Sequence, residues 1–286
     1  MLVSALVSLA SLPFVSIAQA VSIAQAVSNE QSFNSQQEDE SDSTERPNGK
    51  TLAQQNVKHF KVGVSYANSY PLFSFADIED KGFGWSVLEA FAKKHNIKFE
   101  YIPMTITRLQ PSMDNGALDF IFPDNPLWSA YRSNRYPNIY SGPIISTVSS
   151  TFVSKININM PVKDIEKVAI PFGFTAFTWF EPVKDYNIQT IPARDSRAAL
   201  HSVRRQSVDA ADVEYNVGIH LIGSDSTLHH LEVSHNLPHT AIDYHLSSIK
   251  HIVVLEELTK FVEENQALVK TLKSRYKIKY HDEVFP

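Results

Sequence analysis

Apolar and polar positions alternate where the chain first becomes rich in apolar residues. Residues 60–64 alternate as a β-strand does. After an aromatic loop, residues 85–94 place their large apolar side chains on one helical face, which predicts an amphipathic helix. Residues 97–102 predict a second strand. A strand, a helix and a strand over this length indicate a βαβ unit.

The next apolar segments are shorter. Residues 108–115 predict a short helix that ends at Gly116, and residues 118–122 predict a third strand. A loop rich in proline and asparagine follows this strand. Residues 150–153 then predict an extended strand that crosses to a new part of the molecule.

A second strand-and-helix block begins after residue 162. Residues 168–170 predict a short strand, and residues 172–175 predict a turn that leads into a helix. A further helix is predicted over residues 198–205, with Asp195 or Ser196 as its cap.

Near the end of the chain, residues 244–249 predict a second extended crossing segment, and residues 253–276 predict one long helix. The alternation of strands and helices along the chain favours the α/β class. Because two similar strand-and-helix blocks are present, we expect two lobes.

The first 57 residues have a different composition. Residues 1–26 are uncharged and mostly small or apolar, and they contain two Ala-x-Ala sites of the kind that signal peptidase cleaves. A basic start is missing, and a buried N-terminal helix is the alternative. Residues 27–57 are polar and largely acidic, which predicts a flexible leader and disfavours the buried helix. We therefore expect a signal peptide, a leader and export to the periplasm.

Composition excludes several classes of function. The 286 residues carry a net charge of −5 and contain no basic stripe, so nucleic-acid binding has no electrostatic basis. There is no cysteine, which excludes disulfides, thiolate metal sites, a thiol nucleophile and a lipoprotein anchor. We expect a soluble monomer. Aromatic residues make up 11% of the chain, enough to line a pocket with rings.

Five short motifs appear in a fixed order. They are Tyr70-Pro71-Leu72-Phe73-Ser74-Phe75, Gly82-Phe83-Gly84-Trp85, Asn115-Gly116-Ala117-Leu118-Asp119, Tyr140-Ser141-Gly142-Pro143, and the segment from Arg197 to Asp209. With this order and spacing, residues 59–280 resemble the family 3 extracellular solute-binding proteins, the periplasmic partners of amino-acid ABC transporters.

The resemblance implies the periplasmic-binding-protein type II fold, in which two α/β lobes are joined by two hinge-crossing segments and the ligand lies between the lobes. By this analogy, lobe 1 comprises residues 58–149 and 248–286, and lobe 2 comprises residues 150–247. The crossings are expected near Ser150 and near His245.

Two groups of candidate ligand-binding residues follow strand ends, where open α/β sheets bind ligands. Tyr66, Tyr70 and Phe73 would stack on an apolar or cationic part of a solute, unless they form a packed hydrophobic lid. Asp124, Asn125 and Trp128 form the second group. Their alternative is a rigid turn with the tryptophan in the core.

Three arginines are candidate clamps for a carboxylate, because a guanidinium meets a carboxylate through two hydrogen bonds. Arg132 is the first candidate, Arg108 the second and Arg135 the third; neither Arg132 nor Arg135 stands at the spacing typical of the resembled family. Otherwise they form surface or inter-lobe ion pairs. The resemblance also implies that Thr175, at a helix start, meets the ligand carboxylate, and that Glu214 takes an amino group. A simple helix cap is the alternative for Thr175.

Seven histidines lie between His220 and His251, and imidazole is a common metal ligand. No HExxH motif is present and the spacings fit no single helix face, so no metal or other cofactor is expected.

The sequence therefore predicts a non-enzymatic binding protein that closes on an amino acid or a related carboxylate or zwitterion and delivers it to a membrane permease of the ABC type. One alternative is a sensory binding protein that presents the solute to a receptor. Another is a dehydratase or lyase on the same fold, with Glu214, Asp124 or His220 as its acid or base.

Overall fold

The computed structural model describes residues 57–75, 79–129, 136–174 and 176–286. The chain divides into two units, Met1–Ala53 and Gln54–Pro286, and all described residues belong to the second. The expected signal peptide and all but the last residue of the expected leader lie outside the described residues. No helix within the described ranges is long and apolar enough to cross a membrane.

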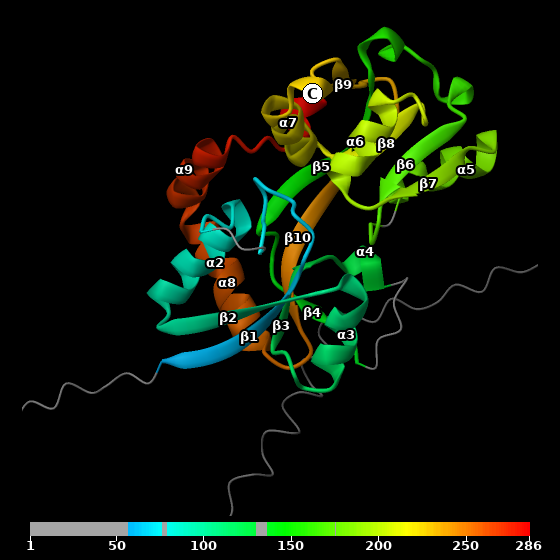
Figure 1. The fold of residues 1–286 in the computed structure, drawn as a ribbon. Helices are drawn as coiled ribbons and strands as arrows, with labels where there is room; N and C mark the ends of the chain where they lie inside the picture. Colours follow the sequence, from blue (N-terminus) through cyan, green and yellow to red (C-terminus); the bar gives the residue numbers. More distant parts are fainter. Residues whose placement is uncertain (1–56, 76–78, 130–135, 175) are drawn as a thin grey trace, which may run out of the picture. The chain divides into compact units, whose positions relative to one another are not determined.

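The first lobe is built on parallel strands. Strand β1 pairs with β2 on one side and with β3 on the other, as a βαβ unit requires. Helices α2 and α3 pack on these strands, and α8 and α9 pack against α2 (Figure 1). The elements are β1 (Lys58–Ser65), α2 (Phe83–Lys94), β2 (Ile97–Met104), α3 (Ile106–Asp114), β3 (Phe120–Asp124), α4 (Pro126–Ser129), β4 (Ile139–Tyr140), α8 (Ile252–Glu264) and α9 (Gln266–Tyr276).

The second lobe repeats this plan. Strand β6 lies parallel to both β7 and β8, and helix α6 packs on β6 and β8. Asp195 is the α6 cap, because its carboxylate accepts a hydrogen bond from Ala198 N at 2.8 Å. The elements are β5 (Ile145–Ser154), β6 (Lys167–Pro171), α5 (Phe180–Tyr186), β7 (Gln189–Ala193), α6 (Ser196–Arg204), β8 (Ala210–Glu214), α7 (Tyr215–Ser224) and β9 (Leu231–Val233), with 3₁₀ turns at Lys155–Asn157, Val162–Asp164, Phe177–Trp179 and Ser226–Leu228. The C-terminal segment that follows α9 contains the short helix α10 (His281–Val284).

Strand β10 (Thr240–Ser248) joins the two lobes (Figure 1). Its later residues pair with β3 and β4, and its residues 240–244 pair with β5. The two expected crossings, near His245 and near Ser150, thus lie in β10 and in β5. The hydrogen-bonded order is continuous, β2-β1-β3-β10-β5-β8-β6-β7, which the sequence analysis did not predict.

The α/β class is confirmed, but one predicted element is wrong. The single helix expected over residues 253–276 is divided into α8 and α9 at Asn265. This residue has φ −113° and ψ 38°, outside the helical region, and its side chain donates a hydrogen bond to Phe261 O at 2.7 Å. The side chain thereby competes with the backbone for a helical carbonyl, which favours a break.

The chain beyond α9 contacts the second lobe. Asn216, at the start of α7, accepts from Lys279 N at 2.7 Å and donates to Lys279 O at 3.0 Å. The Phe285 ring lies flat on His239, with 3.7 Å between the ring centres. Residues of the C-terminal segment therefore add contacts between the two lobes besides those of β5 and β10.

Candidate functional site

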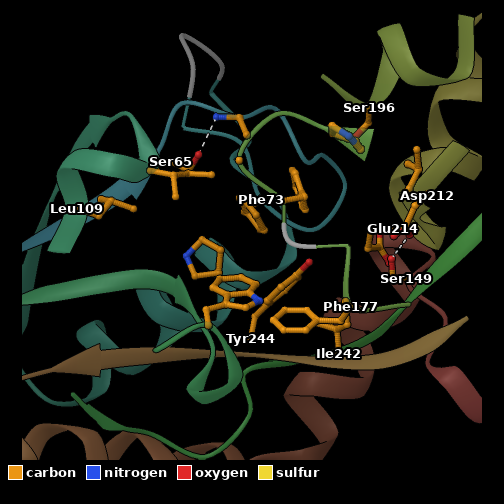
Figure 2. Close-up of a pocket in the computed structure, with 18 of the residues that line it drawn as sticks. Ser65, Phe73, Leu109, Ser149, Phe177, Ser196, Asp212, Glu214, Ile242 and Tyr244 are labelled. Atoms are coloured by element: carbon orange, nitrogen blue, oxygen red, sulfur yellow. Dashed lines mark hydrogen bonds between the residues drawn. The ribbon is translucent and has the colours of Figure 1, made fainter. Parts of the chain in front are cut away.

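A cavity of about 320 Å³ lies where both lobes contribute strand ends (Figure 2). Its walls come from β1, β3, α3, α4 and the loop after β1 in the first lobe, and from β5, β6, the segment after β6, β8 and α6 in the second, with β10 between them. The lining residues are Ser65, Ala67, Phe73, Ile106, Thr107, Leu109, Pro123, Trp128, Ser149, Pro171, Gly173, Phe174, Phe177, Ser196, Asp212, Val213, Glu214, Ile242 and Tyr244.

Aromatic rings form one continuous part of the wall. The buried Tyr244 ring, on β10, lies 5.9 Å from the ring centre of Phe73 and 5.8 Å from that of Trp128. These distances are typical of favourable ring contacts. Three different elements thus present rings to one space, which suits the apolar or cationic part of a small molecule.

Two carboxylates face the cavity from β8. Asp212 and Glu214 are two residues apart on a strand, so their side chains project to the same side. Figure 2 shows them on one side of the cavity and Phe73 and Tyr244 on the other. Both acids are buried, with 6% and 7% of their surface exposed.

Both carboxylate oxygens of Glu214 accept hydrogen bonds from other residues of the protein. Its Oε1 accepts from Thr147 Oγ1, from Asn216 N at 3.0 Å and from Asn216 Nδ2 at 2.9 Å, and its Oε2 accepts from Val217 N at 2.7 Å. Glu214 is therefore the N-cap of α7. Burial raises the pKa of this carboxyl, and the hydrogen bonds oppose the rise because they favour the charged form.

Asp212 is held more loosely. Its Oδ1 accepts a hydrogen bond from Ser149 Oγ. Burial raises the pKa of Asp212 to about 6, and the bond from Ser149 opposes the rise. Burial raises the pKa of the Tyr244 hydroxyl well above its usual value, and the nearby charges of Glu214 and Asp212 raise it further.

No family model and no curated protein sequence matches the chain. Solved structures do. The GluR0 ligand-binding core in complex with L-glutamate has a TM-score of 0.64 at 16% identity, over 76% of this chain and 97% of that one. The amino-acid ABC transporter substrate-binding protein AbpA from Streptococcus pneumoniae, bound to L-arginine, has a TM-score of 0.59 at 17% identity, over 77% and 94%. The ancestral amino-acid-binding protein AncCDT-1, a precursor of cyclohexadienyl dehydratase, has 0.59 at 18% identity, over 76% and 94%.

The chain has the fold of the two-lobed amino-acid-binding proteins. The motif order had predicted this fold, with its two crossing segments. At these identities the likeness shows the fold, and the ligand must be argued from the cavity.

Three of the predicted ligand-binding residues line the cavity of this binding-protein fold: Phe73, Trp128 and Glu214. Tyr66 does not line it and is 61% exposed at the end of β1. Tyr70 lies in the loop after β1 but does not line the cavity, and its ring centre is 4.9 Å from that of His220 on α7.

Arg108 is exposed on α3, and its neighbours on both sides reach the cavity while it does not. Arg132 and Arg135 lie outside the described residues. So does Thr175, and the 3₁₀ turn that follows it begins at Phe177 with Ala176 as its cap. The predicted clamp between an arginine and Thr175 therefore stays a prediction.

Asp124 and Asn125 do not line the cavity. Asp124 is fully buried and accepts from Ser247 Oγ at 2.6 Å, which ties β3 to β10. Asn125 donates to Asp243 O at 2.7 Å and accepts from Leu127 N at 2.8 Å. These bonds fit the rigid-turn interpretation of the two residues.

Sequence reasoning missed Asp212, Ser149 and Tyr244. A signal for Asp212 was present, because it stands two residues before Glu214 on a strand and must share its face. No pattern in the sequence predicts that Ser149 or Tyr244 lies near β8. Across the described ranges, no three metal-ligating side chains gather into a site.

Proposed function

We propose that this protein is a solute-binding protein that captures a small polar solute, an amino acid or a related carboxylate or zwitterion, between its lobes. The observation that carries the proposal is the cavity of about 320 Å³ lined from both lobes, with rings on one side and two buried carboxylates on the other. A pocket that is largely apolar with a few convergent polar groups is typical of small-molecule sites.

Binding would be coupled to closure. A solute that contacts both walls stabilises the arrangement in which the walls face each other, so it shifts the population toward the closed state. Phe73 and Trp128 would cover the apolar part of the solute from the first lobe, and β8 would meet its polar part from the second.

A carboxylate on the solute would need a cation, because an unpaired buried charge costs several kcal/mol. Arg132, together with the helix start that the sequence predicts at Thr175, is the first candidate for that role, and Arg108 is the second. The variants Arg132→Ala and Arg108→Ala, measured by calorimetry, test this clamp. If each binds within about twofold of the wild type, neither arginine holds the solute.

The closed protein would present its solute to an ABC-type permease in the periplasm, after cleavage of residues 1–26 as a signal peptide, and would act as a monomer. A sensory role uses the same closure with a receptor in place of the permease. Permease and ATPase genes beside the gene for this protein would favour uptake, and a histidine kinase gene would favour sensing.

One observation favours an enzymatic alternative. A similar structure is that of a precursor of a dehydratase, and a buried carboxyl with a raised pKa can act as a general acid. If the protein removes water from a cyclohexadienyl substrate, the aromatic product will appear in its ultraviolet spectrum. A stoichiometric binder will bring about no turnover.

A thermal-shift screen over amino acids, polyamines, organic acids and metal ions tests the binding role itself. A solute at 100 times its dissociation constant stabilises the folded state by about 2.7 kcal/mol, which is readily seen. If no solute in the screen raises the melting temperature, the proposed function is wrong.

A further inference from the structure

The two carboxylates of β8 differ in how many of their oxygens already accept a hydrogen bond. Both oxygens of Glu214 already accept hydrogen bonds from the start of α7 and from its neighbour β5. Asp212 has a bond to Oδ1 only, from Ser149. Among the described residues no group donates to Asp212 Oδ2, although the side chain lines the cavity and is 94% buried.

Among the described residues, none that lines the cavity offers Asp212 a compensating positive charge. The described residues that line the cavity include no lysine, arginine or histidine, and the other charged one is Glu214. A carboxylate taken out of water without a partner is unfavourable, and a second carboxylate on the same strand makes it more so. A positive charge placed at Asp212 Oδ2 would offset both effects.

The remaining wall suits the apolar part of such a solute. Tyr244, Phe73 and Trp128 present rings to the cavity, with 5.8–5.9 Å between the centre of the Tyr244 ring and those of the other two. Aromatic rings of this kind bury a large apolar surface against a small molecule. Because the rings and Asp212 lie across one cavity (Figure 2), one small molecule can meet both.

We propose that Asp212, and not the helix-capping Glu214, holds a positively charged nitrogen of the solute, so that the protein selects small molecules with an ammonium or guanidinium end and an apolar body. This inference rests on the proposed binding function and adds to it the charge of the solute and the residue that selects it. The rings take the apolar body, and Ser149 fixes the carboxylate through Oδ1.

Four probes of nearly equal size separate the charge of the solute from its shape: 2-phenylethylamine, L-phenylalanine, 2-phenylethanol and 3-phenylpropanoate. They are titrated by calorimetry at pH 7.5 into the wild-type protein. We expect the amine and the amino acid to bind at least tenfold more tightly than the alcohol and the acid, since only the first two carry an ammonium group.

Asp212→Asn is then titrated with 2-phenylethylamine. Asparagine keeps an oxygen for the Ser149 hydrogen bond and removes the charge, so we expect at least a tenfold loss of affinity. Asp243→Asn is the matched control, because Asp243 lies on β10 between the lining residues Ile242 and Tyr244 but is exposed and does not line the cavity. It should bind within about twofold of the wild type.

The inference is overturned if the alcohol or the acid binds as well as the amine, if none of the four probes binds, or if Asp212→Asn keeps its affinity. The proposed function survives these outcomes provided that the wider thermal-shift screen finds a solute. A screen in which no solute binds overturns the function and the inference together.

Discussion

The Asp212 carboxylate is buried, and its burial makes the stability of the protein without a solute depend on pH. The pKa of Asp212 rises from 3.8 to about 6 because burial disfavours the charged form. The unfolded chain, in which this group is hydrated, loses its proton near pH 4. Between about pH 4 and pH 6 the native state therefore holds more protons than the unfolded state, and raising the pH through this range favours unfolding.

The first prediction follows from this loss of stability with rising pH. Asp212→Asn should raise the free energy of unfolding at pH 7.5 by up to about 3 kcal/mol, the value that corresponds to the rise in pKa. The gain should shrink as the pH falls and vanish only well below pH 3.8, where the wild-type carboxyl is protonated in both states. Urea unfolding at several pH values measures it. A variant that is less stable than the wild type at pH 7.5 would contradict the prediction.

Asn125 illustrates a polar residue at a strand end that serves the fold. Its side chain joins the turn after β3 to β10 through bonds to Asp243 O and Leu127 N. Asn125→Ala should lower the free energy of unfolding by about 1–3 kcal/mol, because both backbone groups lose their partner in a partly buried place. Asn236→Ala, at an exposed site with a 3.4 Å contact, should change it by less than about 0.5 kcal/mol. Equal effects in the two variants would contradict the interpretation.

At the level of single residues, the position after strand ends predicted Phe73 and Trp128, and the family resemblance implied Glu214. Phe73, Trp128 and Glu214 line the cavity because strand ends of both lobes meet there. The rule could not separate them from Asp124 and Asn125, which also end a strand but turn toward β10. Tyr244 could not be predicted, since its position depends on how β10 passes between the lobes.

Among the elements, α7 shows how packing overrides local preference. It contains two glycines and several branched residues, and the sequence predicted no helix there. The Glu214 cap and close packing on β5 hold it. Gly218 lies so near β5 that an added Cβ would be 2.2 Å from Phe152 Cζ, whereas an added Cβ at Gly223 would meet nothing within 4 Å.

These two glycines make a matched pair. Gly223→Ala should stabilise the protein by up to about 1 kcal/mol, because alanine is the better helix former. Gly218→Ala should instead destabilise it by about 1–3 kcal/mol, because the fully buried Phe152 must shift to admit the methyl group. Chemical denaturation of both variants gives the two signs. If both alanines stabilise, α7 does not pack on β5 as described.

Other elements were predictable to the extent that their signal is local. The helix over residues 85–94 and the strands on either side of it have clear periodicity, and they became α2, β1 and β2. Strand β7 was missed, since it is a short and largely exposed strand at the end of the sheet, with Pro192 in it. The break at Asn265 was missed because the apolar pattern continues through it.

For the whole molecule, the order of motifs was enough to predict a two-lobed fold, but not how firmly the lobes are joined. The pairing of β10 with β3 connects residues more than a hundred positions apart, and β10 also pairs with β5. No periodicity in the sequence predicts either pairing. One hydrophobic cluster contains Phe120 of the first lobe and Phe152 of the second. Shared strands and a shared core favour a single cooperative unit.

The last prediction tests that cooperativity with two of the three tryptophans. Trp85 packs on the shared core from α2, and Trp179 is fully buried in a separate cluster of the second lobe. The double variants Trp128→Phe/Trp179→Phe and Trp85→Phe/Trp128→Phe leave one reporter each. In both, we expect the fluorescence midpoint in urea to coincide with the midpoint from far-ultraviolet circular dichroism, because β10 and the shared core must be lost together. Comparing two probes within one variant removes any effect of the substitutions on stability. Separate midpoints in either variant would mean that the lobes unfold independently and that the continuous sheet does not couple them.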